Sequence, residues 1–213
     1  MELLENNLVI NLSTRPDRFE HVTNEFKQLE LIPRRFNAFL TKDGAIGCTI
    51  SHIRCLEIAI EEDKDYIFIC EDDISFTDPY ILKRNIKRFV DNVKNWDMLI
   101  IGGNVIKPFE KIDDYCLKIN NCQTTTGYVV KKHYYNTLLS NFKEGVQKLL
   151  TTDNKRQYAI DIYWKLLQPI DKWYLLYPLT VTQYENFSDI EKKKTNYNHL
   201  MLDPYKDWLF KRR

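Results

Sequence analysis

The sequence predicts an α/β fold in which a mostly parallel central sheet is flanked by helices. Apolar segments alternate with segments whose apolar residues recur at three- and four-residue spacing. Such a strand–helix rhythm is typical of parallel sheets. Segment 65–70 has no polar alternation, as expected of a central strand buried on both faces. With 6 Gly, 7 Pro and no low-complexity linker, residues 1–213 are predicted to form one domain, or one domain of a longer protein.

The elements can be placed in chain order. Residues 7–12 form the first strand, and Pro16 suits the start of the helix that follows. Helix 45–64 has the clearest pattern, with one apolar side made of Ile46, Ile50, Ile53, Leu56 and Ile60. The other expected elements are helix 19–31, strand 34–40, strand 65–70, helix 79–93, strand 97–103, strand 122–130, helices near 131–141 and 159–167, and a last apolar stretch at 173–183.

Composition narrows the class of protein. Lys+Arg 31 against Asp+Glu 30 leaves no overall charge that would attract nucleic acid or an anionic membrane, so we expect no nucleic-acid partner. The five cysteines show no zinc-type spacing, which favours reduced thiols. The N-terminus lacks the pattern of a signal peptide, and no apolar run reaches the ~20 residues needed to span a bilayer. We therefore expect a cytoplasmic chain, or a soluble piece of a larger one.

The stretch YIFICEDDISF (66–76) carries an apolar strand into three carboxylates, Glu71, Asp72 and Asp73. Adjacent carboxylates repel one another, and a hard divalent cation such as Mg²⁺ or Mn²⁺ relieves that repulsion. In α/β sheets, ligands bind beyond the carboxyl ends of the strands, which is where this cluster falls. The alternative is a solvated loop before a helix that Asp78 caps.

Two further segments suit an anionic ligand. INLSTRPDR (10–18) follows a strand with Arg15 and Arg18, which could hold a phosphate or form an ordinary basic turn around Asp17. GAIGCTISH (44–52) places two glycines at a helix start, where the helix dipole favours an anion, with Ser51 and His52 one turn later. A structural role for His52 is the alternative.

Two segments late in the chain complete the set. Thr124–Thr126 and Gly127 would line a polar cleft if that end of the strand is open. Asp161 opens an apolar helix, either as its N-cap or as a general base that deprotonates an attacking hydroxyl.

In this order, INLSTRPDR, GAIGCTISH and YIFICEDDISF resemble the motifs of glycosyltransferase family 25, which includes lipooligosaccharide and collagen galactosyltransferases. Cys70 stands where the family has leucine, and QYENFSDIEKK (183–193) resembles a late S-D-x-E element. The resemblance extends from residue 9 to about 191. It implies a Rossmann-like nucleotide-sugar-binding domain of GT-A type that uses Mn²⁺ or Mg²⁺ and a UDP-sugar.

The resemblance also implies roles for residues. Glu71 and Asp73 become metal ligands at the outer positions of a D-x-D-like motif. Asp161 becomes the candidate general base, placed by its order in the chain. Residues implied to bind the donor are Asn11, Leu12, Arg15, Arg18, Ser51, His52, Asp72, Thr126 and Gly127. Weaker candidates are Ser188, Asp189 and Glu191 on the donor side and His199 as a third metal ligand.

The expected function is transfer of a hexose, galactose or glucose, from a UDP-sugar to a hydroxyl of a glycan, lipooligosaccharide or glycoprotein. Inversion at the anomeric carbon is the family expectation. The alternative is a non-catalytic nucleotide-sugar-binding or assembly module of the same fold; a phosphohydrolase is a weaker third. The tail 205–213 joins three apolar residues to a basic end, which suits peripheral contact with a membrane or a packed helix with a solvated end.

Overall fold

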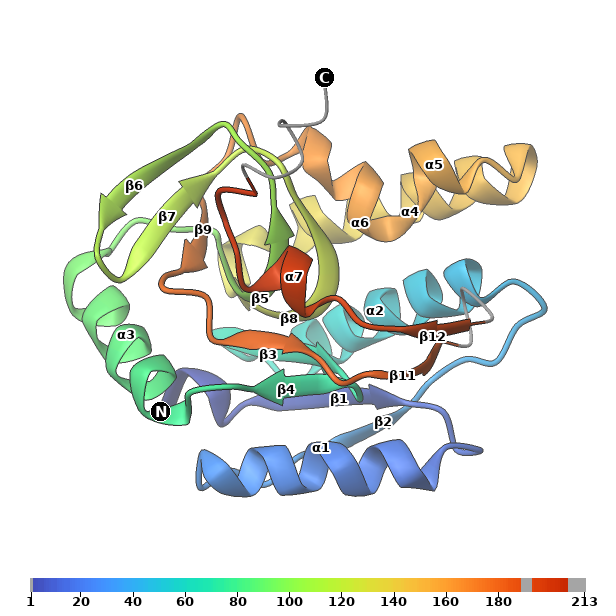
Figure 1. Ribbon diagram of the computed structural model, residues 1–213. Coiled ribbons are helices and arrows are strands. Elements are labelled where there is room, and N and C mark those ends of the chain that lie inside the picture. The colour runs from blue at the N-terminus through green and yellow to red at the C-terminus, as the bar shows by residue number, and fades with distance from the viewer. Residues whose placement is uncertain (1, 189–192, 207–213) are drawn as a thin grey trace.

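The computed structural model describes residues 2–188 and 193–206, and its centre is an eight-stranded sheet (Figure 1). The strands lie in the order β2 (Arg35–Asn37), β1 (Asn7–Asn11), β3 (Tyr66–Glu71), β8 (Cys122–Lys131), β5 (Met98–Val105), β9 (Trp173–Leu176), β7 (Cys116–Ile119) and β6 (Phe109–Asp113). The pairings make β7 and β8 run against the other strands. The expected α/β class with a mostly parallel sheet is confirmed.

Helices cover both faces of the sheet, as predicted. One apolar core joins the sheet to α2 (Gly44–Glu61) and α4 (Tyr135–Thr152). A second core on the other face joins it to α1 (Pro16–Gln28) and α3 (Pro79–Asn92). Strand β3 contributes to both cores, with Ile67 and Ile69 in the first and Phe68 and Cys70 in the second. Its unbroken apolar sequence follows from this two-sided burial.

Smaller elements lie around the end of β3. Strand β4 (Ile74–Phe76) follows the acidic residues and pairs with β10 (Val181–Gln183). Figure 1 shows β4 beside β3 and the red α7 (Asn198–Met201) above them. The remaining elements are β11 (Asn186–Ser188), β12 (Lys193–Thr195), α5 (Lys155–Tyr158), α6 (Ile160–Tyr163) and the 3₁₀ turns η1 (Glu2–Leu4), η2 (Lys132–Tyr134) and η3 (Trp164–Leu166).

Several sequence predictions need correction. The predicted apolar side of α2 is wrong in part, because Ile60 is exposed while Thr49, His52 and Ala59 are buried. Ile53 and Leu56 are buried as predicted, and Ile46 and Ile50 pack against the core, so Ile60 is the one member of the predicted side that faces solvent. Helix α4 extends to Thr152, beyond the predicted end at 141, and segment 159–167 divides into α6 and η3.

The β6–β7 hairpin was not predicted. Residues of β6 are mostly exposed, and so they lack the alternation that marks a half-buried strand. The cap before α3 was anticipated correctly, since the Asp78 carboxylate accepts a hydrogen bond from the backbone N–H of Ile81.

The remaining expectations concern cysteines, membrane spans and the tail. All five cysteines are free thiols, as expected. Within residues 2–188 and 193–206, the helices are too short or too polar to cross a bilayer. Asp189, Glu191 and most of the tail, 207–213, lie outside the described residues.

Candidate functional site

The three acidic residues lie at the edge of the sheet where β1 and β3 end. Parallel pairing of these strands sets Ile10 opposite Glu71. Asn11 therefore lies beside Glu71–Asp73, which we call the acidic turn. Strand β8 runs the other way, with Gly127 opposite Cys70. The first residues of β8 therefore reach the same edge. Polar residues from three distant segments meet here because of the direction in which each strand runs.

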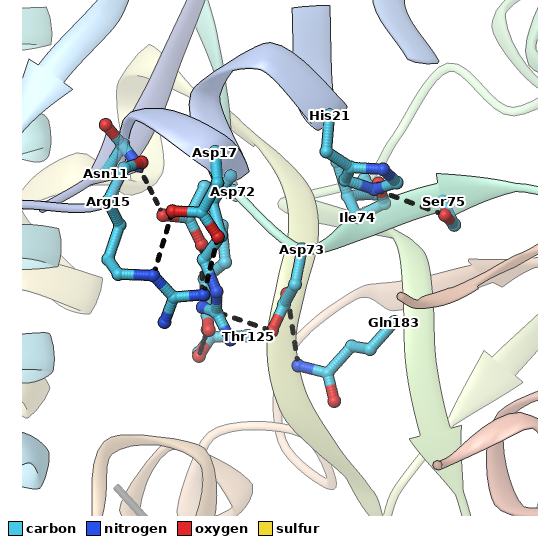
Figure 2. Close-up of polar contacts among 12 residues, drawn as sticks. Asn11, Arg15, Asp17, His21, Asp72, Asp73, Ile74, Ser75, Thr125 and Gln183 are labelled. Carbon is cyan, nitrogen blue, oxygen red and sulfur yellow. Dashed lines mark hydrogen bonds and ion pairs between the residues drawn. The ribbon is translucent and has the colours of Figure 1, made fainter. Parts of the chain in front are cut away.

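Asp72 is held from two sides (Figure 2). Asn11 Nδ2 donates to Asp72 Oδ2 at 2.6 Å, and Arg18 Nη1 donates to Asp72 Oδ1 at 2.9 Å. Burial raises the pKa of Asp72, although Arg18 and Asn11 oppose that rise. Both oxygens of Asp72 thus have partners within the protein, and the side chain joins α1 to the acidic turn.

The two arginines of the motif have different partners. Arg15 forms a bidentate pair with Asp17, with its Nε and Nη2 atoms 3.0 and 2.9 Å from the carboxylate oxygens. This pair lowers the pKa of Asp17. The basic-turn interpretation thus describes Arg15, whereas Arg18 reaches the acidic turn. Leu12 contributes its carbonyl, which accepts a hydrogen bond from the Arg15 backbone N–H at 2.9 Å.

Asp73 points away from Asp72 and toward β10, as Figure 2 shows. Its carboxylate has more distant neighbours, with Gln183 Nε2 at 3.5 Å and Arg18 Nη1 at 3.8 Å. Burial raises the pKa of Asp73 to about 8, and the charges of Glu71 and Asp72 add to that rise. Burial first, and the neighbouring carboxylates second, thus disfavour the charged form of Asp73 in the metal-free protein.

Glu71 faces the start of β8 and helix α2. Thr125 Oγ1 donates to Glu71 Oε1 at 2.5 Å, and His52 Nε2 lies 3.8 Å from the same oxygen. Burial acts to raise the pKa of Glu71, but His52 and Thr125 outweigh it, and the pKa lies below its ordinary value. His52 Nε2 lies 3.8 Å from Glu71 Oε1, which is too long for a hydrogen bond, so Thr125 is the side chain that donates to this oxygen.

Ser51 and His52, both predicted to contact the donor, are completely buried. Ser51 Oγ donates to the Gly47 carbonyl at 2.7 Å and accepts from the Phe39 backbone N–H at 3.0 Å. It thereby fixes the loop before α2. His52 Nδ1 lies 2.7 Å from the Tyr128 hydroxyl, which orients the ring toward Glu71.

Asp161 lies on α6 and accepts a hydrogen bond at 3.1 Å from the backbone N–H of Thr124. The N-cap of α6 is Ala159, so the capping interpretation of Asp161 is wrong. Burial raises the pKa of Asp161; the Thr124 N–H opposes that rise, and the charge of Glu71 adds to it. A carboxylate with a raised pKa is better suited to accept a proton near neutral pH.

Thr126 and Gly127 of β8, both predicted to bind the donor, are packed in the interior. Thr126 is fully buried. A Cβ on Gly127 would lie 2.8 Å from Ile74 Cδ1, so only glycine leaves room for the side chain that follows the acidic turn. Gly127 therefore helps to place Asp73 indirectly. His199 lies on α7 and is exposed.

The carboxylates fit a hard divalent cation. Mn²⁺ and Mg²⁺ prefer oxygen ligands. Asp73 has a raised pKa and distant polar neighbours, which is the condition that a cation would relieve. Asp72 is committed to Asn11 and Arg18, which leaves Glu71 and Asp73 as the carboxylates of the turn that a cation could engage.

Sequence reasoning missed several contacts of this site. Tyr128, Gln183 and Cys48 each contact or lie beside a residue of the site. The antiparallel course of β8 makes Thr125 the partner of Glu71, and no local pattern reveals strand direction. Thr125 was named within the stretch Thr124–Thr126, but its pairing with Glu71 was not predicted.

Comparison with known proteins gives a family and one related sequence. The model of the family described as "Glycosyltransferase family 25 (LPS biosynthesis protein)" matches residues 39–152, more than half of the chain. A Haemophilus influenzae protein named "Putative glycosyltransferase" is 36% identical over 92 residues, which cover 33% of this chain and 33% of that protein. The match thus spans about a third of the relative's length.

Similar solved structures include a glycosyltransferase involved in glycosylation of the major capsid of PBCV-1. It is 11% identical with a TM-score of 0.46, and 79% of each chain is covered. Another is a Drosophila β-1,4-galactosyltransferase 7 variant in complex with manganese, UDP-Gal and xylobiose. It is 11% identical with a TM-score of 0.45, covering 97% of this chain and 79% of the other.

The family match includes two of the three sequence motifs and the strand that carries the acidic turn. The sheet that places this turn beside Asn11, Arg18 and Thr125 has the expected α/β architecture. The chain belongs to glycosyltransferase family 25.

Proposed function

We propose that this protein transfers a hexose, galactose or glucose, from a UDP-sugar to a hydroxyl of a glycan, lipooligosaccharide or glycoprotein. The observation that carries the proposal is that two adjacent residues of β8 hold two carboxylates beside Asp73: Thr124 donates to Asp161, and Thr125 donates to Glu71. Membership of the family supports the reaction class. Galactose and glucose follow from the family resemblance.

Glu71 and Asp73 would hold Mn²⁺ or Mg²⁺. When bound, the cation would supply positive charge to the diphosphate of the leaving UDP. Arg18 and Asn11 hold Asp72 and thus keep the acidic turn in the orientation that leaves Asp73 directed away from α1. Asn11, Leu12 and Arg15 on the neighbouring loop are proposed to contact the uridine and diphosphate.

Asp161 is proposed as the general base. Its carboxylate would take the proton of the acceptor hydroxyl while that oxygen forms a bond to the anomeric carbon. The bond from the anomeric carbon to the diphosphate breaks at the same time, and UDP leaves. The Thr124 N–H holds Asp161 in place. Attack opposite to the leaving group gives inversion, as the family resemblance implies.

The test is isothermal titration of UDP into the protein with and without Mn²⁺. We expect binding that requires the metal and that is lost in Asp73→Asn. Asp113→Asn is the matched control, because it makes the same change at an exposed position on β6. Metal-independent binding, or equal binding by Asp73→Asn and wild type, would contradict the assignment.

A second measurement separates the enzyme from a non-catalytic module. UDP release is followed across a panel of UDP-sugars with Mn²⁺ and candidate acceptors. Donor-dependent release that exceeds the release by Asp161→Asn supports transfer. Metal-dependent UDP binding without release on any donor would favour the binding module. We also propose a cytoplasmic location with peripheral membrane contact through the tail. Vesicle flotation tests this contact by comparing residues 1–213 with a chain that ends at Lys206.

A further inference from the structure

A thiol, an imidazole and a carboxylate converge beside the acidic turn. Cys48 and His52 are four residues apart on α2, so their side chains lie on the same side of the helix, one turn apart. Glu71 approaches them from the end of β3. Cys48 Sγ, one ring nitrogen of His52 and a carboxylate oxygen of Glu71 all lie within 4.8 Å of one another.

His52 presents a ring nitrogen that the protein leaves without a hydrogen bond. The side chain is fully buried, and its Nε2 atom has no hydrogen-bond partner among the described residues. Its Nδ1 atom is fixed at 2.7 Å from the Tyr128 hydroxyl, and the two rings are stacked. Tyr128 thus orients Nε2 toward Glu71, 3.8 Å away. A second partner that fixes the ring is the usual support of a metal-binding histidine.

The spacing suits a tetrahedral metal. Zinc bonds of ~2.0–2.3 Å imply ligand atoms about 3.3–3.7 Å apart. The His52–Glu71 separation of 3.8 Å already meets that requirement closely. The remaining pairs lie within 4.8 Å, so they need to close by about 1.5 Å at most. Small side-chain rotations can supply this, since Cys48 and Glu71 are only partly buried.

The ligand set also distinguishes between metals. Thiolate and imidazole favour zinc, whereas Mn²⁺ and Mg²⁺ favour oxygen ligands. Cys48 and Glu71 are partly exposed, which leaves a route for the ion and a fourth position for water. A cation at this position would share Glu71 with the carboxylates of the acidic turn.

We propose that Cys48, His52 and Glu71 form a zinc-binding site that is separate from the pair Glu71–Asp73 but shares one ligand with it. The Cys48 thiol loses its proton to solvent as sulfur binds the ion, and His52 binds through neutral Nε2. Zinc would inhibit the protein because a Glu71 carboxylate drawn toward Cys48 and His52 is a weaker ligand for the cation at Asp73. Binding of zinc stands on the geometry alone, and only the inhibition rests on the proposed function.

The direct test uses the full chain stripped of metal with EDTA and then desalted. Zinc affinity is measured by competition with a chromophoric chelator, and Co²⁺ serves as a spectroscopic probe. We expect one tight ion per chain, a sulfur-to-cobalt charge-transfer band and the visible bands of tetrahedral cobalt. Cys48→Ala should weaken zinc binding by about tenfold or more and abolish the charge-transfer band.

Cys55→Ala is the matched control, because Cys55 lies on the same helix with its side chain buried in the core. Cys116→Ala on β7 is a second control if the first does not fold. Thermal melting verifies the fold of each variant. Equal zinc affinity in Cys48→Ala and wild type, or cobalt spectra without a sulfur band, would overturn the site.

Inhibition is measured separately, at fixed Mn²⁺ and UDP-sugar. Zinc should inhibit UDP release by wild type and by Cys55→Ala, and Cys48→Ala should need about tenfold more zinc or more. Equal inhibition of all three would refute competition through this site. If the protein releases no UDP with any donor, the proposed function fails, and the zinc and cobalt measurements still decide the site.

Discussion

Arg18 of α1 and Asp72 of the acidic turn form a buried ion pair, with 2.9 Å between Nη1 and Oδ1. Their side chains are only 14% and 8% exposed, so water screens the pair weakly. Asn11 completes the shell of Asp72 from the end of β1. The pair connects the first helix to the turn after β3, and it fixes which carboxylates of the turn stay available.

Loss of Arg18 should destabilise the protein strongly. Arg18→Ala leaves Asp72 buried beside Glu71 and Asp73 without its cation. Removal of one partner from a buried pair costs about 3–5 kcal/mol, and we expect a loss in the lower part of that range because Asn11 remains. Urea unfolding in EDTA measures the change. Arg15→Ala is the control, since its partner Asp17 is 56% exposed and the pair should contribute at most about 1 kcal/mol. Equal losses in both variants would contradict the assignment.

Asp73 should make the metal-free protein less stable as pH rises. The carboxyl has a pKa of about 8 in the folded chain and about 4 when unfolded. Below pH 4 it is protonated in both states and costs nothing. As pH rises from about 4 to 8, the unfolded state ionises more readily, so the free energy of unfolding falls.

Asp73→Asn should therefore raise the melting temperature in EDTA near pH 7.5, with a gain of roughly 2–4 kcal/mol. The gain should disappear near pH 4. Mn²⁺ should stabilise wild type but not the variant. Melting curves across pH 4–8.5 provide the measurement, with Asp113→Asn as the exposed control. A variant that is less stable than wild type at pH 7.5 would show that Asp73 is a structural residue.

The sequence predicted the position of the acidic turn because that position depends on local patterns. An apolar run marks a buried strand, and the strand–helix rhythm places its carboxyl end at the ligand edge. The partners of the turn depend on information that is not local. Strand β8 enters antiparallel between β3 and β5, which brings Thr125 to Glu71.

The partners of individual side chains could not be predicted from the sequence either. Arg15 and Arg18 look equivalent in the sequence, yet Arg15 binds Asp17 and Arg18 binds Asp72. The difference arises from the path of α1 over β3 and β4. The role of Ser51 was also hidden, since its partner Phe39 lies in a loop whose course follows from packing against Gly47.

Asp161→Asn should lower kcat by about 10²–10⁴, the usual contribution of a general base. Asparagine can still accept the Thr124 N–H, so the fold and the binding of UDP with Mn²⁺ should be unchanged. Burial raises the pKa of Asp161, so wild-type kcat should fall as the pH drops through that pKa. The kcat of the variant should not show this acidic fall. Steady-state kinetics with a matched titration of UDP provide the readout.

Asp153→Asn is the control for this change. Asp153 is exposed at the end of α4 and has a φ of 54°, which asparagine adopts well. Its kcat should match wild type. A kcat for Asp161→Asn within about threefold of wild type would exclude Asp161 as the base, since a base contributes at least about a hundredfold.

Thr124 is held in a strained backbone conformation next to Asp161. Its φ of 72° is rare for a β-branched residue and costs on the order of 1–3 kcal/mol. Glycine adopts this conformation freely but loses about 0.5–1 kcal/mol of entropy. Thr124→Gly should therefore leave the free energy of unfolding within about 1 kcal/mol of wild type, or raise it.

Thr126→Gly gives the comparison, because Thr126 is fully buried in β8 and is absent from the positive-φ residues. That variant should lose about 1–3 kcal/mol, since it removes buried side-chain volume and adds a flexible residue within a strand. If the strain serves to aim the Thr124 N–H at Asp161, Thr124→Gly should also lower kcat without weakening UDP binding. Denaturant unfolding and kinetics are measured on the same two variants. If Thr124→Gly loses as much free energy of unfolding as Thr126→Gly, the Thr124 side chain stabilises its own backbone conformation and the strain argument is wrong.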